Sequence, residues 1–239
     1  MLIWIIAAAA AYFVKGLCGF ANTLMFTSIL AVGSTANIDI SPVDLLLGCP
    51  SNLIMTWKKR SRLDARIVLP LSGLILLGSI GGALLLKVVS VQRIKLMFGF
   101  VVIIVATDMW FREHLHDQSK MPNGIMVLIG LLSGFLCGLF GVGALLAAYV
   151  SRVTDDSETF KANISAVFSI ENLFRLISYT ALGIITASGI RQALFLLPVE
   201  LAALYAGMAC SRFLKEILVK RLIIILLILS GVMMILSNI

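Results

Sequence analysis

The stretch Gly16-Leu17-Cys18-Gly19-Phe20-Ala21 interrupts a long apolar segment, residues 2–32, and this interruption decides how the chain is organised. As a single helix the segment would be about 46 Å long, whereas the hydrocarbon core of a bilayer is about 30 Å thick. Glycine weakens the interior of a helix, so we expect the segment to break here. Two shapes fit: one broken, tilted crossing, or a re-entrant hairpin that enters and leaves on the same side of the membrane.

The second half of the chain repeats this pattern. A similar stretch, Gly138-Leu139-Phe140-Gly141-Val142-Gly143, interrupts the apolar segment 122–150. Two further matches follow in the same order: Ser51-Asn52-Leu53 against Glu171-Asn172-Leu173, and Leu69-Pro70 against Leu197-Pro198. Ordered matches at nearly constant offsets indicate an internal repeat. We therefore predict two homologous halves, residues 1–113 and 122–239, joined by a connecting loop at 114–121.

The composition is that of a membrane protein. Apolar residues make up 60% of the chain and charged residues 13%, and the mean hydropathy is +1.07. In soluble domains the apolar fraction is about 45–50% and the charged fraction about 25%. This predicts an all-α integral membrane protein. Eight apolar segments can be distinguished, four in each half: 2–32, 42–57, 67–86, 91–111, 122–150, 162–185, 189–211 and 217–238.

Loop charges favour the hairpin shape for both long segments. With eight simple crossings, the two sides of the membrane would carry nine and eight Lys and Arg residues, whereas two hairpins change this distribution to 13 and four. Because cytoplasmic loops are rich in Lys and Arg, we expect the second arrangement. It leaves three full crossings per half, inverts one half relative to the other, and places both termini outside the cytoplasm. The expected location is a bacterial inner membrane.

The net charge of +7 comes largely from these Lys and Arg residues of the loops. Basic residues lie mainly in short groups between apolar segments, so we interpret them as orientation signals and expect no nucleic-acid partner.

A solute site is expected where the two glycine breaks meet near the midplane of the membrane. A helix that restarts after a break presents unpaired N–H groups and a partial positive charge, which suit a small anion. The alternative is that the glycines only permit close helix packing. The candidate substrate-binding residues are Lys15, Gly19, Asn22, Asn52, Gly141, Gly143, Asn172 and Arg175.

Arg175 lies more than two turns from either end of its apolar segment. A charge at that depth usually faces a bundle interior or a water-filled cavity, and a guanidinium group fits the oxygens of sulfite, a sulfonate or a carboxylate. The alternative is a structural ion pair with Glu171, one turn earlier. Lys15, at the first break, either faces the anion or extends to the membrane interface.

Glu171 and Glu200 are candidate proton carriers, with a purely structural role as the alternative. Asp44 follows Ser41-Pro42 and is interpreted as a helix cap.

The sequence gives no sign of an enzyme, a cofactor or a metal site. It has no HExxH or GxSxG motif, and its two histidines lie in the polar loop at 114–117. The four cysteines, in apolar segments without a CxxC spacing, are expected to be free thiols: Cys18, Cys49, Cys137 and Cys210. Without an ATP-binding motif, transport would be secondary.

The doubled glycine-rich segment, the Asn-Leu on the following helix and the late proline resemble the TauE/SafE sulfite exporter family, also called TSUP, over nearly the whole chain. The resemblance implies transport of sulfite, an organosulfonate or another sulfur-containing anion. We expect export, by alternating access of the two halves around the midplane site. The expected partners are the small anion, the lipid bilayer and a second copy of the chain. The alternatives are a carrier for a non-sulfur carboxylate, a cation carrier and an accessory membrane subunit without transport activity.

Overall fold

The computed structural model describes residues 1–32, 37–85, 123–140, 143–154 and 156–214, with isolated positions between 100 and 111 and between 218 and 236. The predicted loop 114–121, Gly141 and most of the segments 91–111 and 217–238 lie outside the described residues. Every element in the described ranges is helical, as predicted.

The described helices follow the predicted apolar segments, and both long segments are divided in two. The first half contains α1 (Leu2–Cys18), α2 (Asn22–Val32), α3 (Asn37–Lys58), the short 3-10 helix η1 (Arg60–Arg62) and α4 (Ala65–Leu85). The second half contains α6 (Asn123–Phe140), α7 (Ala144–Val153), α8 (Ser157–Ala181) and α9 (Ala187–Ser211).

The chain reverses its course at the first break. Gly19 and Ala21 have φ angles of 91° and 74°, in the left-handed region that ends helices. The Trp4 and Phe26 ring centroids consequently lie 5.7 Å apart, whereas in a continuous helix these residues would be about 33 Å apart. The helices α1 and α2 therefore pack against each other instead of forming one rod.

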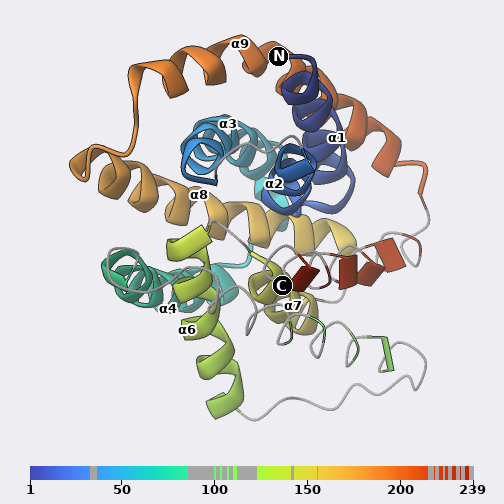
Figure 1. Ribbon diagram of the computed structural model, residues 1–239. Helices are drawn as coiled ribbons and strands as arrows, with labels where there is room; N and C mark the ends of the chain where they lie inside the picture. The colour runs from blue at the N-terminus through green and yellow to red at the C-terminus, as the bar shows by residue number, and fades with distance from the viewer. Residues whose placement is uncertain are drawn as a thin grey trace.

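The packing of the helices is symmetric under exchange of the halves. The helix α4 packs on α6, and its counterpart α9 packs on α1; likewise α2 packs on α3, and α7 on α8. The contact between α3 and α9 corresponds to the contact between α8 and α4. The helices α3 and α8 also contact each other. In Figure 1, α8 crosses the middle of the molecule, with α1, α2, α3 and α9 on one side and α4 and α6 on the other.

Small residues make two of these contacts close, and they occupy matched positions. A β-carbon on Gly16 of α1 would lie 2.9 Å from the Gly207 Cα of α9. In the other half, a β-carbon on Gly138 of α6 would lie 2.7 Å from the Ser79 Cα of α4. Gly16 and Gly138 therefore have the alternative role considered for the glycines, which is to permit close packing of helices in the membrane.

The central helices α3 and α8 run antiparallel. Near the start of α3, Ser41 accepts a hydrogen bond from Arg175, late in α8, at 3.2 Å. Near the end of α3, Met55 accepts one from Ser165, early in α8, at 3.9 Å. Beyond that point Lys59 forms an ion pair with Glu158. The α3–α4 and α7–α8 connections therefore lie at the same end of the molecule.

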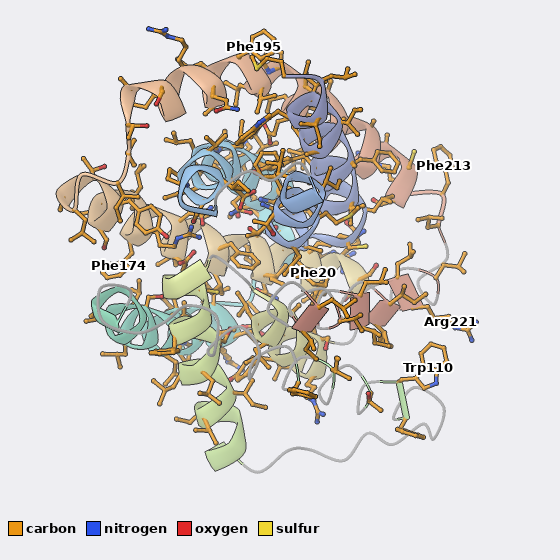
Figure 2. All side chains as sticks on the ribbon, viewed as in Figure 1. Phe20, Trp110, Phe174, Phe195, Phe213 and Arg221 are labelled. Atoms are coloured by element: carbon orange, nitrogen blue, oxygen red, sulfur yellow. The ribbon has the colours of Figure 1, made fainter. Side chains whose placement is uncertain are left out.

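The outer surface suits lipid. Large apolar side chains are exposed on several helices, including Leu69, Leu77, Leu194 and Phe213. Figure 2 shows Phe195 and Phe213 at the outer edge, whereas Phe20, only 1% exposed, lies in the interior. By length and composition alone, one described helix, α9, could cross a bilayer, and Leu2–Cys18 and Ala65–Gly81 are shorter apolar helices. The central helices α3 and α8 are long enough but carry buried charged residues.

Candidate functional site

One cavity lies where the first helix break and the start of α7 meet the middle of α3 and α8. It encloses about 370 Å³ of empty space, its open mouth included. The residues that line it come from both halves of the chain: Phe20, Ala21, Asn22, Thr23, Leu24, Asp44, Leu45, Gly48, Asn52, Gly143, Phe168 and Asn172. Four of the predicted substrate-binding residues are therefore brought together, namely Asn22, Asn52, Gly143 and Asn172.

The other predicted residues take different positions. Gly19 forms the turn before the lining residue Phe20, and its φ of 91° disfavours any residue with a side chain, while a β-carbon would also lie only 3.1 Å from Lys161 Cγ. Lys15, Arg175, Glu171 and Glu200 are buried but are not among the lining residues. Gly141 lies outside the described residues, so its role stays a prediction.

Asp44 is the most densely hydrogen-bonded group of the cavity. Its Oδ1 accepts from the Tyr12 hydroxyl and from Asn22 Nδ2, both at 3.1 Å, and its Oδ2 accepts from the Thr23 hydroxyl at 2.5 Å. Asp44 is only 2% exposed. Three donors from α1 and α2 thus converge on one carboxyl group of α3.

The interpretation of Asp44 as a helix cap is wrong. The helix α3 begins at Asn37, so Asp44 lies two turns inside it. Pro42 does not mark the helix start, because a proline near the N-terminus removes only one backbone hydrogen bond there. The available signal was a carboxylate inside an apolar segment, which alone suggests a buried functional group.

The two asparagines that occupy matched positions in the predicted repeat face the cavity from α3 and α8. Asn52 is 2% exposed and Asn172 6%. Gly48, one turn before Asn52, leaves space between the helices, and a β-carbon there would lie 3.0 Å from Asn172 Nδ2. Asn52 Oδ1 is buried, and no described residue donates a hydrogen bond to it.

The second break brings a helix N-terminus to the cavity. Gly143 is the N-cap residue of α7, and no side chain caps that end. The first N–H groups of α7 therefore carry the partial positive charge of an uncapped helix start. A β-carbon on Gly143 would lie 1.9 Å from Phe168 Cζ, so the ring packs directly against the glycine.

Lys15 is held inside the first half. It is 1% exposed, and its Nζ donates to the Ser51 hydroxyl at 2.8 Å. It therefore does not extend to the membrane interface. Ser51 in turn donates to the Leu47 or Gly48 carbonyl of its own helix, at 3.2 and 3.0 Å.

Arg175 contacts α3 and its own helix. Besides the hydrogen bond to Ser41, its Nε lies 3.8 Å from Glu171 Oε1, and its guanidinium carbon lies 5.1 Å from the Tyr179 ring centroid. The ion pair with Glu171, which was the alternative to substrate contact, is therefore present in the structure.

Two buried carboxyl groups lack hydrogen-bond donors. Among the described residues, nothing donates to either oxygen of Glu171 or of Glu200. Glu200 is on α9 and interacts electrostatically with Lys15 and Asp44. Within the same ranges, no three His, Cys, Asp or Glu side chains form a group that could hold a metal ion.

The family described as Sulfite exporter TauE/SafE matches residues 4–234, nearly the whole chain. No curated protein and no solved structure gives a significant match.

Proposed function

We propose that this chain, which belongs to the TauE/SafE sulfite exporter family, binds a small sulfur-containing anion in the cavity between its two halves and carries it across the membrane. Membership of that family makes it an integral membrane transporter for sulfur anions. The proposal concerns the place of binding, the mechanism and the class of substrate: sulfite or a small organosulfonate, exported from a bacterial cytoplasm.

One observation carries the proposal: the starts of two helices and the asparagine pair line one cavity. Asn22 begins α2 and Gly143 caps α7, while Asn52 and Asn172 come from the central helices. Helix N-termini are natural anion sites because their N–H groups are unpaired and their dipoles are positive. Side-chain amides add donors without adding a fixed charge, so the anion can also leave.

An inverted arrangement of the halves is supported by the direction of α3 and α8. These helices hold matched places in the repeat, and their contacts run antiparallel from Ser41–Arg175 to Lys59–Glu158. Matched helices would be parallel if the halves were related by an axis along the membrane normal. With eight simple crossings, the loops that carry Lys59 and Glu158 would lie on opposite sides of the membrane, which is incompatible with their ion pair.

We assign alternating access to movement of the two halves about the cavity. The buried side chains of Lys15 and Arg175 supply positive charge near the bound anion. Glu171 and Glu200 are the proposed proton carriers. Both carboxyl groups are buried without a hydrogen-bond donor among the described residues, and ionisable groups inside a membrane bundle often relay protons, so we assign to them proton binding that accompanies anion binding. Lowering the pH on the side from which the anion enters should therefore raise its uptake.

The test uses purified protein in liposomes and measures uptake of labelled sulfite, a small sulfonate, acetate and phosphate. The wild type and Ser72→Ala, a buried α4 residue outside the cavity, should take up the sulfur anions. The double variant Asn52→Ala/Asn172→Ala should lose at least tenfold in uptake. Equal uptake by this variant would remove the cavity from the mechanism, and preference for acetate would replace the substrate class with a carboxylate.

A further inference from the structure

Lys161, near the start of α8, is a buried cation outside the cavity. Its side chain is 1% exposed, and its Cγ lies against the turn at Gly19 that ends α1. An ammonium group has three N–H donors. Within the described residues its acceptor is Glu158 Oε1, at 3.5 Å, which is longer than an ordinary hydrogen bond. Because a buried charge is costly unless it is paired, Lys161 depends on an anion at this position.

The anion that pairs with Lys161 is shared and reaches water. Through its other oxygen, Glu158 forms the ion pair with Lys59, so one carboxylate serves two lysines. The side chain of Glu158 is 47% exposed, whereas those of Lys59 and Lys161 are 15% and 1% exposed. A further electrostatic neighbour of Lys161 is the Cys18 thiol, which is only a weak hydrogen-bonding group. Glu158 can therefore turn out into water, while the two ammonium groups stay in place.

One face of α8 leads from Lys161 to the cavity. Positions 161, 168 and 172 share that face because they are separated by seven and four residues, and Phe168 and Asn172 line the cavity. At 1.5 Å per residue, Lys161 lies about 10 Å along the helix from Phe168. The layer between them contains Ser165, which is hydrogen-bonded to Met55 of α3. Lys161 therefore lies between the cavity and the end of the molecule that carries the α3–α4 connection.

That end of the molecule is basic. The ranges 58–66 and 152–161 contain seven Lys and Arg residues and four Asp and Glu residues. A positively charged opening raises the local concentration of anions. Two of its cations are engaged with aromatic rings, since Lys58 Nζ lies 4.0 Å from the Tyr205 ring centroid and the Arg60 guanidinium carbon 4.8 Å from that of Trp57. Of the basic residues in these two ranges, Lys161 is the most deeply buried one that the structure describes.

We propose that Lys59 and Lys161 form a second anion-binding site, which the Glu158 carboxylate occupies until a sulfur oxyanion displaces it. Sulfite and sulfonates resemble a carboxylate in carrying several acceptor oxygens and a delocalised charge, so they can accept hydrogen bonds from both lysines. The exchange keeps Lys161 paired throughout. The place of this site in transport rests on the proposed function, whereas anion binding does not. The basic loops make this end cytoplasmic, so an exported anion would meet the second site before the cavity.

Binding is tested in the double variant Asn52→Ala/Asn172→Ala, so that the cavity contributes little. Thermal unfolding is measured at increasing sulfite concentration, with chloride keeping the ionic strength constant. Adding Glu158→Gln, which removes the competing carboxylate, should lower the sulfite concentration for half-maximal stabilisation at least fivefold. Asp64→Asn is the matched control, because it removes an acidic group from the same end that accepts a hydrogen bond from the Arg66 N–H. It should leave that concentration unchanged.

The lysines are tested in the same background. Adding Lys161→Met to the Glu158→Gln protein should abolish the stabilisation by sulfite. If that protein does not fold, Lys59→Met in its place should raise the half-maximal sulfite concentration at least fivefold. A purely structural ion pair would lower the unfolding temperature of Glu158→Gln without changing the sulfite concentration that it needs. That result would overturn the proposal.

The part of the second site in transport is tested with the cavity intact, in vesicles whose α3–α4 connection faces the added sulfite. Lys161→Met should raise the KM for sulfite uptake at least fivefold and change kcat less than twofold. Arg66→Gln, at an exposed arginine of the same connection, should change neither. An unchanged KM in Lys161→Met would exclude Lys161 from the transport path. Stabilisation by sulfite in a protein that transports none would leave the second site standing and refute the proposed function instead.

Discussion

Gly134 of α6 lies so close to Ile75 of α4 that a β-carbon on the glycine would be 2.3 Å from the Ile75 carbonyl oxygen. Because that atom belongs to the backbone, the helices would have to separate to accept even one methyl group. The Gly134→Ala substitution should therefore destabilise the protein by about 1–3 kcal/mol, the usual effect of overpacking.

Gly73, on an exposed face of α4, is the matched control. A β-carbon there would meet no atom within 4 Å, so Gly73→Ala should leave stability unchanged or raise it by about 0.5–1 kcal/mol. Thermal unfolding in detergent compares the two variants. Equal stability of both would show that α4 and α6 are not held at this distance.

Arg175 and Glu171 should depend on each other for stability. Removing one partner of a buried ion pair leaves an uncompensated charge and costs about 3–5 kcal/mol. Arg175→Leu alone should therefore unfold at a much lower temperature, and Arg175→Leu/Glu171→Leu should regain most of the loss. Anion uptake by the double variant separates the two roles of Arg175. If stability is restored but uptake is still lost, Arg175 has a role in transport. If uptake is restored as well, the role of Arg175 is structural only.

Asp156 should stabilise the start of α8 in a pH-dependent way. It accepts hydrogen bonds from the backbone N–H groups of Thr159 and Glu158, at 2.9 and 3.0 Å. The bond from the Thr159 backbone is the main reason that the pKa of Asp156 lies below its usual value of 3.8. A lowered pKa means that the stabilisation is fully present above the unfolded pKa and is lost as the pH falls through the folded one.

We therefore expect Asp156→Ala to cost about 1 kcal/mol at pH 7. The difference from the wild type should shrink below a pH of about 4. Unfolding of both proteins by denaturant across this range measures it. A difference that is the same at pH 7 and pH 3 would show that the carboxylate does not act as the cap.

The pair Lys59 and Glu158 gives a direct test of topology. In a protein whose four cysteines are replaced, Lys59→Cys/Glu158→Cys should form a disulfide under mild oxidation, because the two side chains are in contact. A membrane-impermeant thiol reagent should reach both single-cysteine variants from the same side of the membrane. Labelling from opposite sides would exclude two hairpins and restore eight simple crossings.

Much of this fold could be predicted from the sequence because glycine acts locally. The glycines at 16, 19, 138 and 143 stand where helices break or cross, and the structure ends α1 at Cys18 and starts α7 at Ala144. The asparagine pair was recognisable because Asn52 and Asn172 occur at matched positions in the repeat. Both residues line the cavity.

The hydrogen bonds around Asp44 could not be predicted because they depend on tertiary contacts. Tyr12, Thr23 and Asp44 come from three helices, and their spacing in the sequence gives no sign that they meet. The partners of Lys15 and Arg175 could not be predicted for the same reason, since Ser51 and Ser41 are both on α3 and are reached only in the folded bundle. A charge inside an apolar segment indicates burial, but it does not indicate which neighbour receives it.

The central claim is that the cavity between the halves opens in turn to each side of the membrane. In a protein without its native cysteines, we would place a single cysteine at the lining residue Leu45, which is 1% exposed, and measure its labelling rate with an impermeant thiol reagent added from either side. Arg60→Cys, in η1, serves as a one-sided control. The account predicts that Leu45→Cys is labelled from both sides and that sulfite slows both rates several-fold. Labelling from one side only, or at rates that sulfite leaves unchanged, would contradict it.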